Sequence, residues 1–424
     1  MNQPVNSADA LDELKLQYEQ AKTKKLNLNM SRGKPAPSQL DLSNGLLKTM
    51  DTYITADGTD ARNYGIGDGI PECRKLFADL LGLQPQQIIM GGNSSLSMMF
   101  DTLASMCLFG TGGSTPWHYY RFQGTPVKFL CPAPGYDRHF RICQELGIGM
   151  IPVPLTSEGP DMEMVASLAK KDPLIKGIWC VPLHSNPEGI CYSDQVVDQL
   201  ASMETAADDF RIFWDNAYCV HHLFDDAAEQ DQLLDIAATC REAGTEDRCF
   251  KFASTSKVTF PGAGISALAA SPANIAEIKK RVGVQTIGHD KLNQLRHVRF
   301  LRDAEGLAAH MAKHAAILRP KFELVNAKLQ EGLDEVGGCS WSNPRGGYFV
   351  SFDAPQGCAK RVVTLAKEAG VTMTGAGATY PYKQDPNDSN IRIAPTLPPL
   401  EELDEAMDVF TVCVKLAYVE KLLG

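Results

Sequence analysis

The sequence lacks the features of exported, membrane-spanning and metal-binding proteins. Its 12 cysteines include no C-x-x-C pair, so free thiols in a reducing compartment are the expectation. The N-terminal stretch MNQPVNSADALDELKLQYEQ is polar and acidic, unlike a secretory signal. No apolar run is long enough to span a bilayer. We therefore expect a cytoplasmic protein with no membrane partner.

Positive charge is also scarce. The chain has 41 Lys and Arg residues against 51 Asp and Glu residues, which gives a net charge of -10. This balance argues against nucleic acid as the main partner, although it allows a local positive pocket for a small anion. His221 and His222 are adjacent, but no acidic or cysteine residue has a suitable spacing from them, so we predict no metal site.

The order of the apolar segments indicates the fold class. Short apolar runs alternate with helical patterns from about residue 84 onwards, as in VKFLCP, IKGIWCVP, RIFWDNA and CFKFAS. Such alternation predicts an α/β fold with a mostly parallel sheet flanked by helices. We expect a large domain over 61–310, a smaller α/β domain over 311–424, and an N-terminal segment, 1–60, that packs with the small domain. Residues 289–332 are predicted to be helical almost throughout.

Ligands of parallel sheets bind beyond the carboxyl ends of the strands, so the residues after each apolar run are the candidates. Each of them also has a structural interpretation. Ser94 and Ser95 follow QIIMGGN, where a helix N-terminus suits a phosphate but a simple serine cap is equally expected. Tyr136 can stack on a flat ring or lie in the core. Asn186 belongs to an Asn-Pro turn or donates a hydrogen bond to a ligand.

The last two strand ends carry stronger chemistry. Asp215 ends RIFWD, and a buried carboxylate needs a partner such as a protonated ring nitrogen or an arginine; Tyr218 follows three residues later. Lys257 is the only charged residue of STSKVTFPGAG. A desolvated lysine has a lowered pKa and can form a Schiff base. Ser254 and Ser256 precede it as potential phosphate donors, whereas an ordinary loop lysine is the alternative.

Together these strand ends supply each contact that pyridoxal phosphate requires. With the motifs SRGKPAP, APGYDRHF, HSNPEG and STSKVTFPG, the chain resembles the fold-type I, pyridoxal-phosphate-dependent aminotransferases of the aspartate aminotransferase superfamily. Within that superfamily it is most similar to the branch related to MocR-type regulators, which includes the type Ic aspartate aminotransferases. The resemblance extends from about residue 28 to residue 418.

The resemblance implies a role for each candidate. Lys257 would be the Schiff-base lysine, Asp215 the pyridinium partner, Tyr218 and Asn186 the donors to the ring oxygen, and Tyr136 the stacking ring. The four serines would bind the phosphate, Tyr64 would reach it from the second subunit of a homodimer, Arg392 would bind the substrate α-carboxylate, and Gly33 would lie in a loop that closes over substrate.

One departure from the family concerns the phosphate. The arginine expected seven or eight residues after the lysine is replaced by Gly264 and Ile265. We expect backbone N–H groups and hydroxyls, with another basic residue, to bind and neutralise the phosphate in its place.

The implied reaction is ping-pong transfer of an amino group, most simply from L-aspartate to 2-oxoglutarate, with Arg138 or Arg32 as the cation for a distal carboxylate. Alanine, aromatic or 2-aminoadipate substrates and pyridoxal-phosphate lyase chemistry are alternatives, because the same cofactor site serves them. A ligand-sensing regulator without its DNA-binding domain is a remote alternative.

Overall fold

The continuous apolar runs of the sequence form the strands of one eight-stranded sheet in the computed structural model, which describes residues 8–424. In spatial order the strands are β2 (Ile88–Gly91), β9 (Ser266–Ala270), β8 (Cys249–Ser254), β7 (Arg211–Asp215), β6 (Ile175–Cys180), β3 (Lys128–Ala133), β4 (Gly149–Thr156) and β5 (Gly159–Pro160). Neighbours from β8 to β4 pair in parallel, whereas β9 and β5 pair antiparallel to theirs. The predicted mostly parallel sheet is therefore confirmed.

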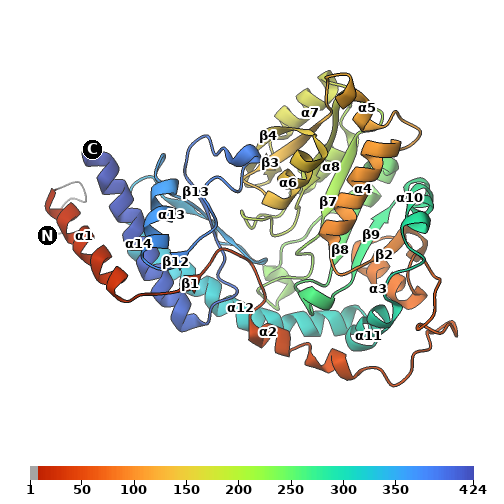
Figure 1. Cartoon of the computed structure of the whole chain (residues 1–424), viewed down its shortest axis with the longest axis horizontal. Coiled ribbons are helices and arrows are strands. Elements are labelled where there is room, and N and C mark those ends of the chain that lie inside the picture. Colours follow the sequence, from red (N-terminus) through yellow and green to blue (C-terminus); the bar gives the residue numbers. More distant parts are fainter. Residues whose placement is uncertain (1–7) are drawn as a thin grey trace.

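Both faces of the strands β6, β7 and β9 are buried, which is why these strands are mostly apolar rather than alternating, whereas β4 has exposed residues. Phe213 points into one cluster, whereas its neighbours Ile212 and Trp214 point into the cluster on the opposite face. The helices of the same part of the chain are α3 (Pro71–Leu81), α4 (Ser95–Phe109), α5 (Trp117–Phe122), α6 (Asp137–Leu146), α7 (Met162–Lys171), α8 (Asp194–Ser202), α9 (Ile236–Glu242) and α10 (Pro272–Gln285). They enclose the sheet in Figure 1.

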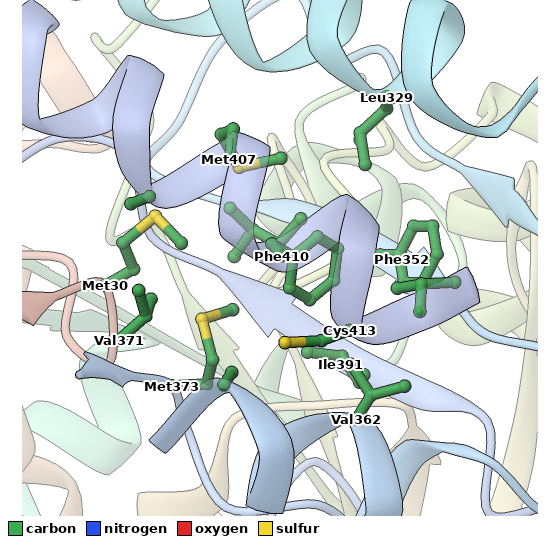
Figure 2. Packing of buried hydrophobic residues seen from close by; sticks show 14 of the residues in the cluster. Met30, Leu329, Phe352, Val362, Val371, Met373, Ile391, Met407, Phe410 and Cys413 are labelled. Atoms are coloured by element: carbon green, nitrogen blue, oxygen red, sulfur yellow. The ribbon is translucent and has the colours of Figure 1, made fainter. Parts of the chain in front are cut away.

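A three-stranded antiparallel sheet forms a second, smaller unit. Its strands are β10 (Ser340–Trp341), β11 (Val350–Asp353) and β13 (Asn390–Ile393), and its helices are α13 (Ala359–Glu368) and α14 (Leu400–Leu423). Phe352 and Ile391 lie against Phe410 of α14 in a single apolar cluster, as Figure 2 shows. Burial of each such aromatic side chain contributes about 1.5–3 kcal/mol.

The first described residues belong to the same unit in space (Figure 1). Helix α1 (Ala8–Thr23) packs against α14, and the Tyr18 hydroxyl donates to the carbonyl oxygen of Leu365 over 3.0 Å. Strand β1 (Leu28–Asn29) then pairs in parallel with β12 (Val371–Thr372). Residues 27–43 are rich in Pro, Gly and Ser, which is typical of a loop, but they also form β1 and the short helix α2 (Pro37–Asp41).

Residues 289–332 are helical almost throughout, as predicted, but they form two helices. Helix α11 (Lys291–Leu301) ends at Arg302, whose φ of 66° is incompatible with a right-handed helix. Asp303 then caps α12 (Ala304–Leu333) by accepting a hydrogen bond from the N–H of Gly306 over 2.8 Å. Helix α12 runs from the large sheet into the core of the small unit.

Residues 8–424 can be compared with the expectations for membrane spans, metal sites and disulfide bonds. None of the helices described there combines the length and the apolarity that a membrane span requires. In the same range, no three His, Cys, Asp or Glu side chains are grouped as metal ligands. All cysteines of the chain lie in this described part, and they are free.

Candidate functional site

A cavity of about 530 Å³ lies at the carboxyl edge of the large sheet, where it meets the small unit. All but one of the residues expected at the site line it. Those residues are Arg32, Gly33, Ser94, Ser95, Tyr136, Arg138, Asn186, Asp215, Tyr218, Ser254, Ser256, Lys257 and Arg392. The exception is Tyr64, whose side chain is 82 % exposed and lies outside this cavity of its own chain.

Lys257 stands in the turn that follows β8. Its Nζ lies 4.9 Å from the ring centroid of Tyr218 and 5.9 Å from that of Tyr348. Among residues 8–424, no carboxylate lies within ion-pairing distance of this amine. Burial lowers the pKa of Lys257, while the charge of Asp215 acts in the opposite direction. A lysine in this environment is a better nucleophile and proton acceptor near neutral pH than one in solvent.

Asp215 is the last residue of β7 and is 2 % exposed. Its Oδ2 accepts a hydrogen bond from Nε2 of His139 over 3.1 Å, and that imidazole stacks on Trp179. The other oxygen, Oδ1, is buried and has no hydrogen-bond partner within the described residues. A buried carboxylate oxygen without a donor is costly, so this atom fits a ligand that presents an N–H group from the cavity.

The sequence reasoning did not find His139. It lies three residues after Tyr136 near the start of α6, and residues at this spacing share one face of a helix. That helical spacing was the available signal.

Hydroxyl and backbone groups gather at one end of the cavity. Ser94 caps α4, and its Oγ accepts from the N–H of Leu96 over 3.2 Å. Ser254 donates to Ser256 over 3.0 Å, and Ser256 donates to the carbonyl oxygen of Asn93 over 3.2 Å. The positive end of the α4 dipole and these hydroxyls together fit an anion such as a phosphate.

The positions where the family usually has an arginine are closely packed. A Cβ atom at Gly264 would lie 2.9 Å from Oγ1 of Thr255 and 3.1 Å from the carbonyl oxygen of Phe260. Ile265 is 2 % exposed and its N–H donates to Thr255 over 3.0 Å. The other cationic side chains that line the cavity, besides Lys257, are Arg32, Lys34, Arg138 and Arg392.

Arg392 also lines the cavity and lies on β13 of the small sheet. Its Nη1 donates to Oδ1 of Asn186 and to Oδ1 of Asp137, each over 3.1 Å. Its Cζ lies 4.8 Å from the ring centroid of Phe349, whereas its Nε has no partner in the described residues. An arginine held on one side and free on another fits a carboxylate ligand.

The same region explains the glycine of the N-terminal loop. A Cβ atom at Gly33 would lie 2.6 Å from Cζ of Phe349, so the loop reaches the cavity wall only because residue 33 has no side chain. Neither Asp137 nor Phe349 was expected at the site. Asp137 stands between two assigned residues of APGYDRHF, whereas nothing in the sequence distinguishes Phe349 from a core aromatic.

Three side chains hold the loop that carries Lys257. Nδ1 of His297 donates to the carbonyl oxygen of Asn293 over 2.8 Å, which leaves Nε2 to accept from the hydroxyl of Thr259 over 2.9 Å. Nε2 of His310 lies 2.7 Å from the carbonyl oxygen of Val258, and the Tyr348 hydroxyl lies 3.5 Å from that of Lys257. The lysine backbone is therefore fixed on the side away from the cavity.

The buried, hydrogen-bonded position of His297 predicts that the protein loses stability in acid. Burial lowers the pKa of His297 to about 4, whereas an unfolded histidine titrates near 6.5. Between these values the unfolded chain binds more protons, so stability falls as pH falls from about 6.5 to about 4, by up to roughly 3 kcal/mol for this residue. We expect the fall in thermal unfolding midpoint from pH 7.5 to pH 5 to be smaller in His297→Gln than in the unmodified protein. Replacement of the half-buried His118 by glutamine is the control, and equal falls in His297→Gln and the unmodified protein would contradict the prediction.

The fold and the cavity define the class of protein: this is the fold of the fold-type I transferases. A sequence model described as aspartate amino-transferase matches residues 3–424, and the chain belongs to this family. It is 49 % identical over 430 residues to a Mycolicibacterium smegmatis protein named as an aminotransferase, with 100 % of this chain and 99 % of that protein covered. It is 46 % identical over 412 residues to an aspartate aminotransferase of Corynebacterium glutamicum, with 96 % and 94 % covered. A crystal structure of an aspartate transaminase from Corynebacterium glutamicum superposes with a TM-score of 0.94 at 44 % identity, and the match covers all of both chains.

The family, the two relatives and this structure together show that the chain is an aminotransferase.

Proposed function

We propose that the chain binds pyridoxal 5'-phosphate in this cavity and transfers the amino group of L-aspartate to 2-oxoglutarate. The observation that carries the proposal is the pairing of Asp215 and Lys257 in one cavity. The carboxylate has a buried oxygen with no donor, and the amine has no ionic partner among residues 8–424. A protonated ring nitrogen for the first and an aldehyde carbon for the second would satisfy both.

The other side chains fit the remaining parts of the cofactor. The N-terminus of α4 and the four serines would hold the phosphate, and Tyr136 would stack on the ring. Asn186 presents Oδ1 to Arg392, which leaves its Nδ2 to donate to the ring oxygen. Tyr218 is 3 % exposed, and burial keeps its pKa well above its usual value, so it stays a neutral donor.

The bound cofactor would supply an electron-withdrawing ring that acidifies the Cα proton of the amino acid. The chain's own residues would do the rest. Asp215 Oδ1 would keep the proton on the ring nitrogen, and Arg392 would fix the α-carboxylate as a bidentate pair. Lys257 Nζ would then take the Cα proton and return it, as general base and then acid.

Aspartate is the proposed substrate because further exposed cations, Arg32 and Arg138 among them, lie on the wall of the same cavity. Either one can pair with a distal carboxylate. The named relative from Corynebacterium glutamicum favours the same substrate. We also propose that the chain belongs to the MocR-like branch and to the type Ic aspartate aminotransferases, on the four motifs that carry the resemblance.

The experiment that tests this function is a half-reaction panel. The holoenzyme is mixed with L-aspartate, L-glutamate, L-alanine, L-phenylalanine and 2-aminoadipate, and the visible absorbance of the cofactor is followed. Aspartate and glutamate are expected to react fastest, and Arg32→Ala or Arg138→Ala is expected to slow them without slowing alanine. If both variants leave the aspartate rate unchanged, the substrate assignment is wrong.

We propose a homodimer in which Tyr64 enters the cavity of the second copy. Its 82 % exposure in the single chain supports this arrangement. The proposed domain limits are 61–310 and 311–424, with 1–60 packed on the latter. They are supported by the extent of the two sheets and by the pairing of β1 with β12.

A complementation experiment tests the shared site. Heterodimers of Lys257→Ala with Tyr64→Ala contain one cavity in which both residues are intact, provided that Tyr64 acts in its partner. We expect their turnover to approach half that of the unmodified dimer and to exceed both homodimers. Turnover no higher than that of Tyr64→Ala alone would show that Tyr64 acts within its own chain or not at all.

A further inference from the structure

The small sheet has one apolar and one polar face, and the polar face meets the turn that carries Asn186. Ser351 lies opposite Arg392, and Asp353 lies opposite Asn390, in the pairing of β11 with β13. Directly opposed residues share a face, so these four polar side chains point the same way. Phe352 and Ile391 point to the other side, into the core of Figure 2.

Two residues of one turn contact this polar face. Asn186 accepts from Arg392 over 3.1 Å, and Glu188, two residues later, accepts from the hydroxyl of Ser351 over 2.6 Å at its Oε1. Arg392 and Ser351 are direct strand partners. The turn and the strand pair are therefore joined at two adjacent points, one of which contains the arginine of the proposed carboxylate site.

The Glu188 contact is built into a larger network. Asn390 donates from Nδ2 to Ser351 over 2.9 Å and to Oδ1 of Asp353 over 3.1 Å, and it accepts from Thr379 over 2.8 Å. These bonds fix the rotamer of Ser351, so that its hydroxyl is directed at Glu188.

The turn itself is rigid and closely packed. The N–H of Gly189 donates to the carbonyl oxygen of Ser185 over 2.7 Å, and the N–H of Ser185 donates to that of Ile190 over 3.0 Å. Gly189 has a φ of 72°, and a Cβ atom there would lie 2.4 Å from Cβ of Pro344, in the segment before β11. A shift at Glu188 would therefore be transmitted to Asn186 rather than absorbed locally.

We propose that Glu188 is a positioning residue for the substrate carboxylate. By accepting the hydrogen bond from Ser351, it fixes the position of the β11–β13 pair and hence the orientation of the Arg392 guanidinium toward the ligand. This inference rests on the proposed function, because it takes Arg392 as the carboxylate-binding residue. Glu188 itself does not line the cavity and contacts neither ligand nor cofactor in this scheme.

The protonation of Glu188 makes glutamine the conservative replacement at this position. Burial, with the neighbouring charge of Asp353, raises the pKa of Glu188 to about 7 although the Ser351 hydrogen bond lowers it. Both the charged and the neutral carboxyl are therefore populated at neutral pH. Glutamine keeps an oxygen that accepts from Ser351, whereas alanine removes it.

The test is a double-mutant cycle on the holoenzyme with Glu188→Ala, Ser351→Ala and the double variant. We expect each single variant to raise KM for L-aspartate about tenfold with kcat changed less than about twofold, as for the loss of one hydrogen bond to a charged group. The double variant should have the KM of the singles, and Glu188→Gln should have a KM within about twofold of the unmodified enzyme. The proposal is overturned if Glu188→Ala leaves KM unchanged or lowers only kcat. It is also overturned if the KM increases of the two single variants multiply in the double variant, or if the KM of Glu188→Gln is as high as that of Glu188→Ala.

A stability cycle separates this proposal from the proposed function. The unfolding free energies of the same variants report the coupling of Glu188 with Ser351 whether or not the chain turns over aspartate. Coupling in stability and in KM supports the proposal, and coupling in neither overturns it. Absence of any half-reaction in the unmodified holoenzyme with every amino acid would instead overturn the proposed function.

Discussion

Lys257→Ala is expected to lower transamination turnover by at least about 10⁴-fold, the upper range for loss of a general acid–base residue. The expectation follows from the position of the half-buried amine in the cavity, where its Nζ lies 4.9 Å from the ring centroid of Tyr218. Water can fill the space left by the lysine side chain, but it is not held at a fixed position from which to accept and return the Cα proton. Steady-state turnover of L-aspartate with 2-oxoglutarate measures the effect.

The matched control for this variant is Lys280→Ala, which removes an exposed lysine of α10. Its turnover should equal that of the unmodified enzyme. Both variants should keep their thermal unfolding midpoints within a few degrees, because Lys257 makes no ion pair in the described structure. Full turnover in Lys257→Ala would remove the lysine from the mechanism.

Arg392→Ala is expected to lower kcat/KM for every amino acid by about 10³-fold, since a bidentate charge-assisted pair and its geometry are both lost. It also leaves Asp137 and Asn186 without the donor that each has now. Arg392→Lys should recover only part of the loss, because an ammonium group cannot form the planar fork. The measurement is kcat/KM for L-aspartate and for L-alanine in each variant.

Comparison of two amino acids makes this result specific. Arg392 is proposed to bind the α-carboxylate that all amino acids share, so aspartate and alanine should lose rate by the same factor. Arg138→Ala, the control on the same cavity wall, should affect aspartate alone. An Arg392→Ala variant that loses aspartate turnover but keeps alanine turnover would place Arg392 at the distal carboxylate instead.

The sequence was sufficient to predict the large sheet and the residues at its carboxyl edge, because both follow from local rules. A strand buried on two faces is apolar throughout, so IKGIWC and RIFWD are visible without a structure. Parallel strands also bring their carboxyl ends to one edge. That rule alone explains how Tyr136 and Lys257, 121 positions apart by their numbers, come to line one cavity.

Contacts between side chains of distant elements were beyond the same reasoning. The bond from His139 to Asp215 joins α6 to β7, and the bond from Ser351 to Glu188 joins β11 to the turn after β6 across 163 positions. Their existence depends on how the units pack, which no local spacing encodes. The division between α11 and α12 has no local signal either: Arg302 has a φ of 66°, a positive value that glycine adopts far more readily than arginine.

The pairing of β1 with β12 also constrains how the chain is made. Ser31 accepts at its carbonyl oxygen from Thr374, across 343 positions of sequence. During synthesis, α1 and β1 are therefore made long before β12 and α14, and their apolar positions stay uncovered until those later elements have emerged. The large sheet contains no strand from either terminal segment and has no such delay. The small unit can thus be completed only after α14 has been made.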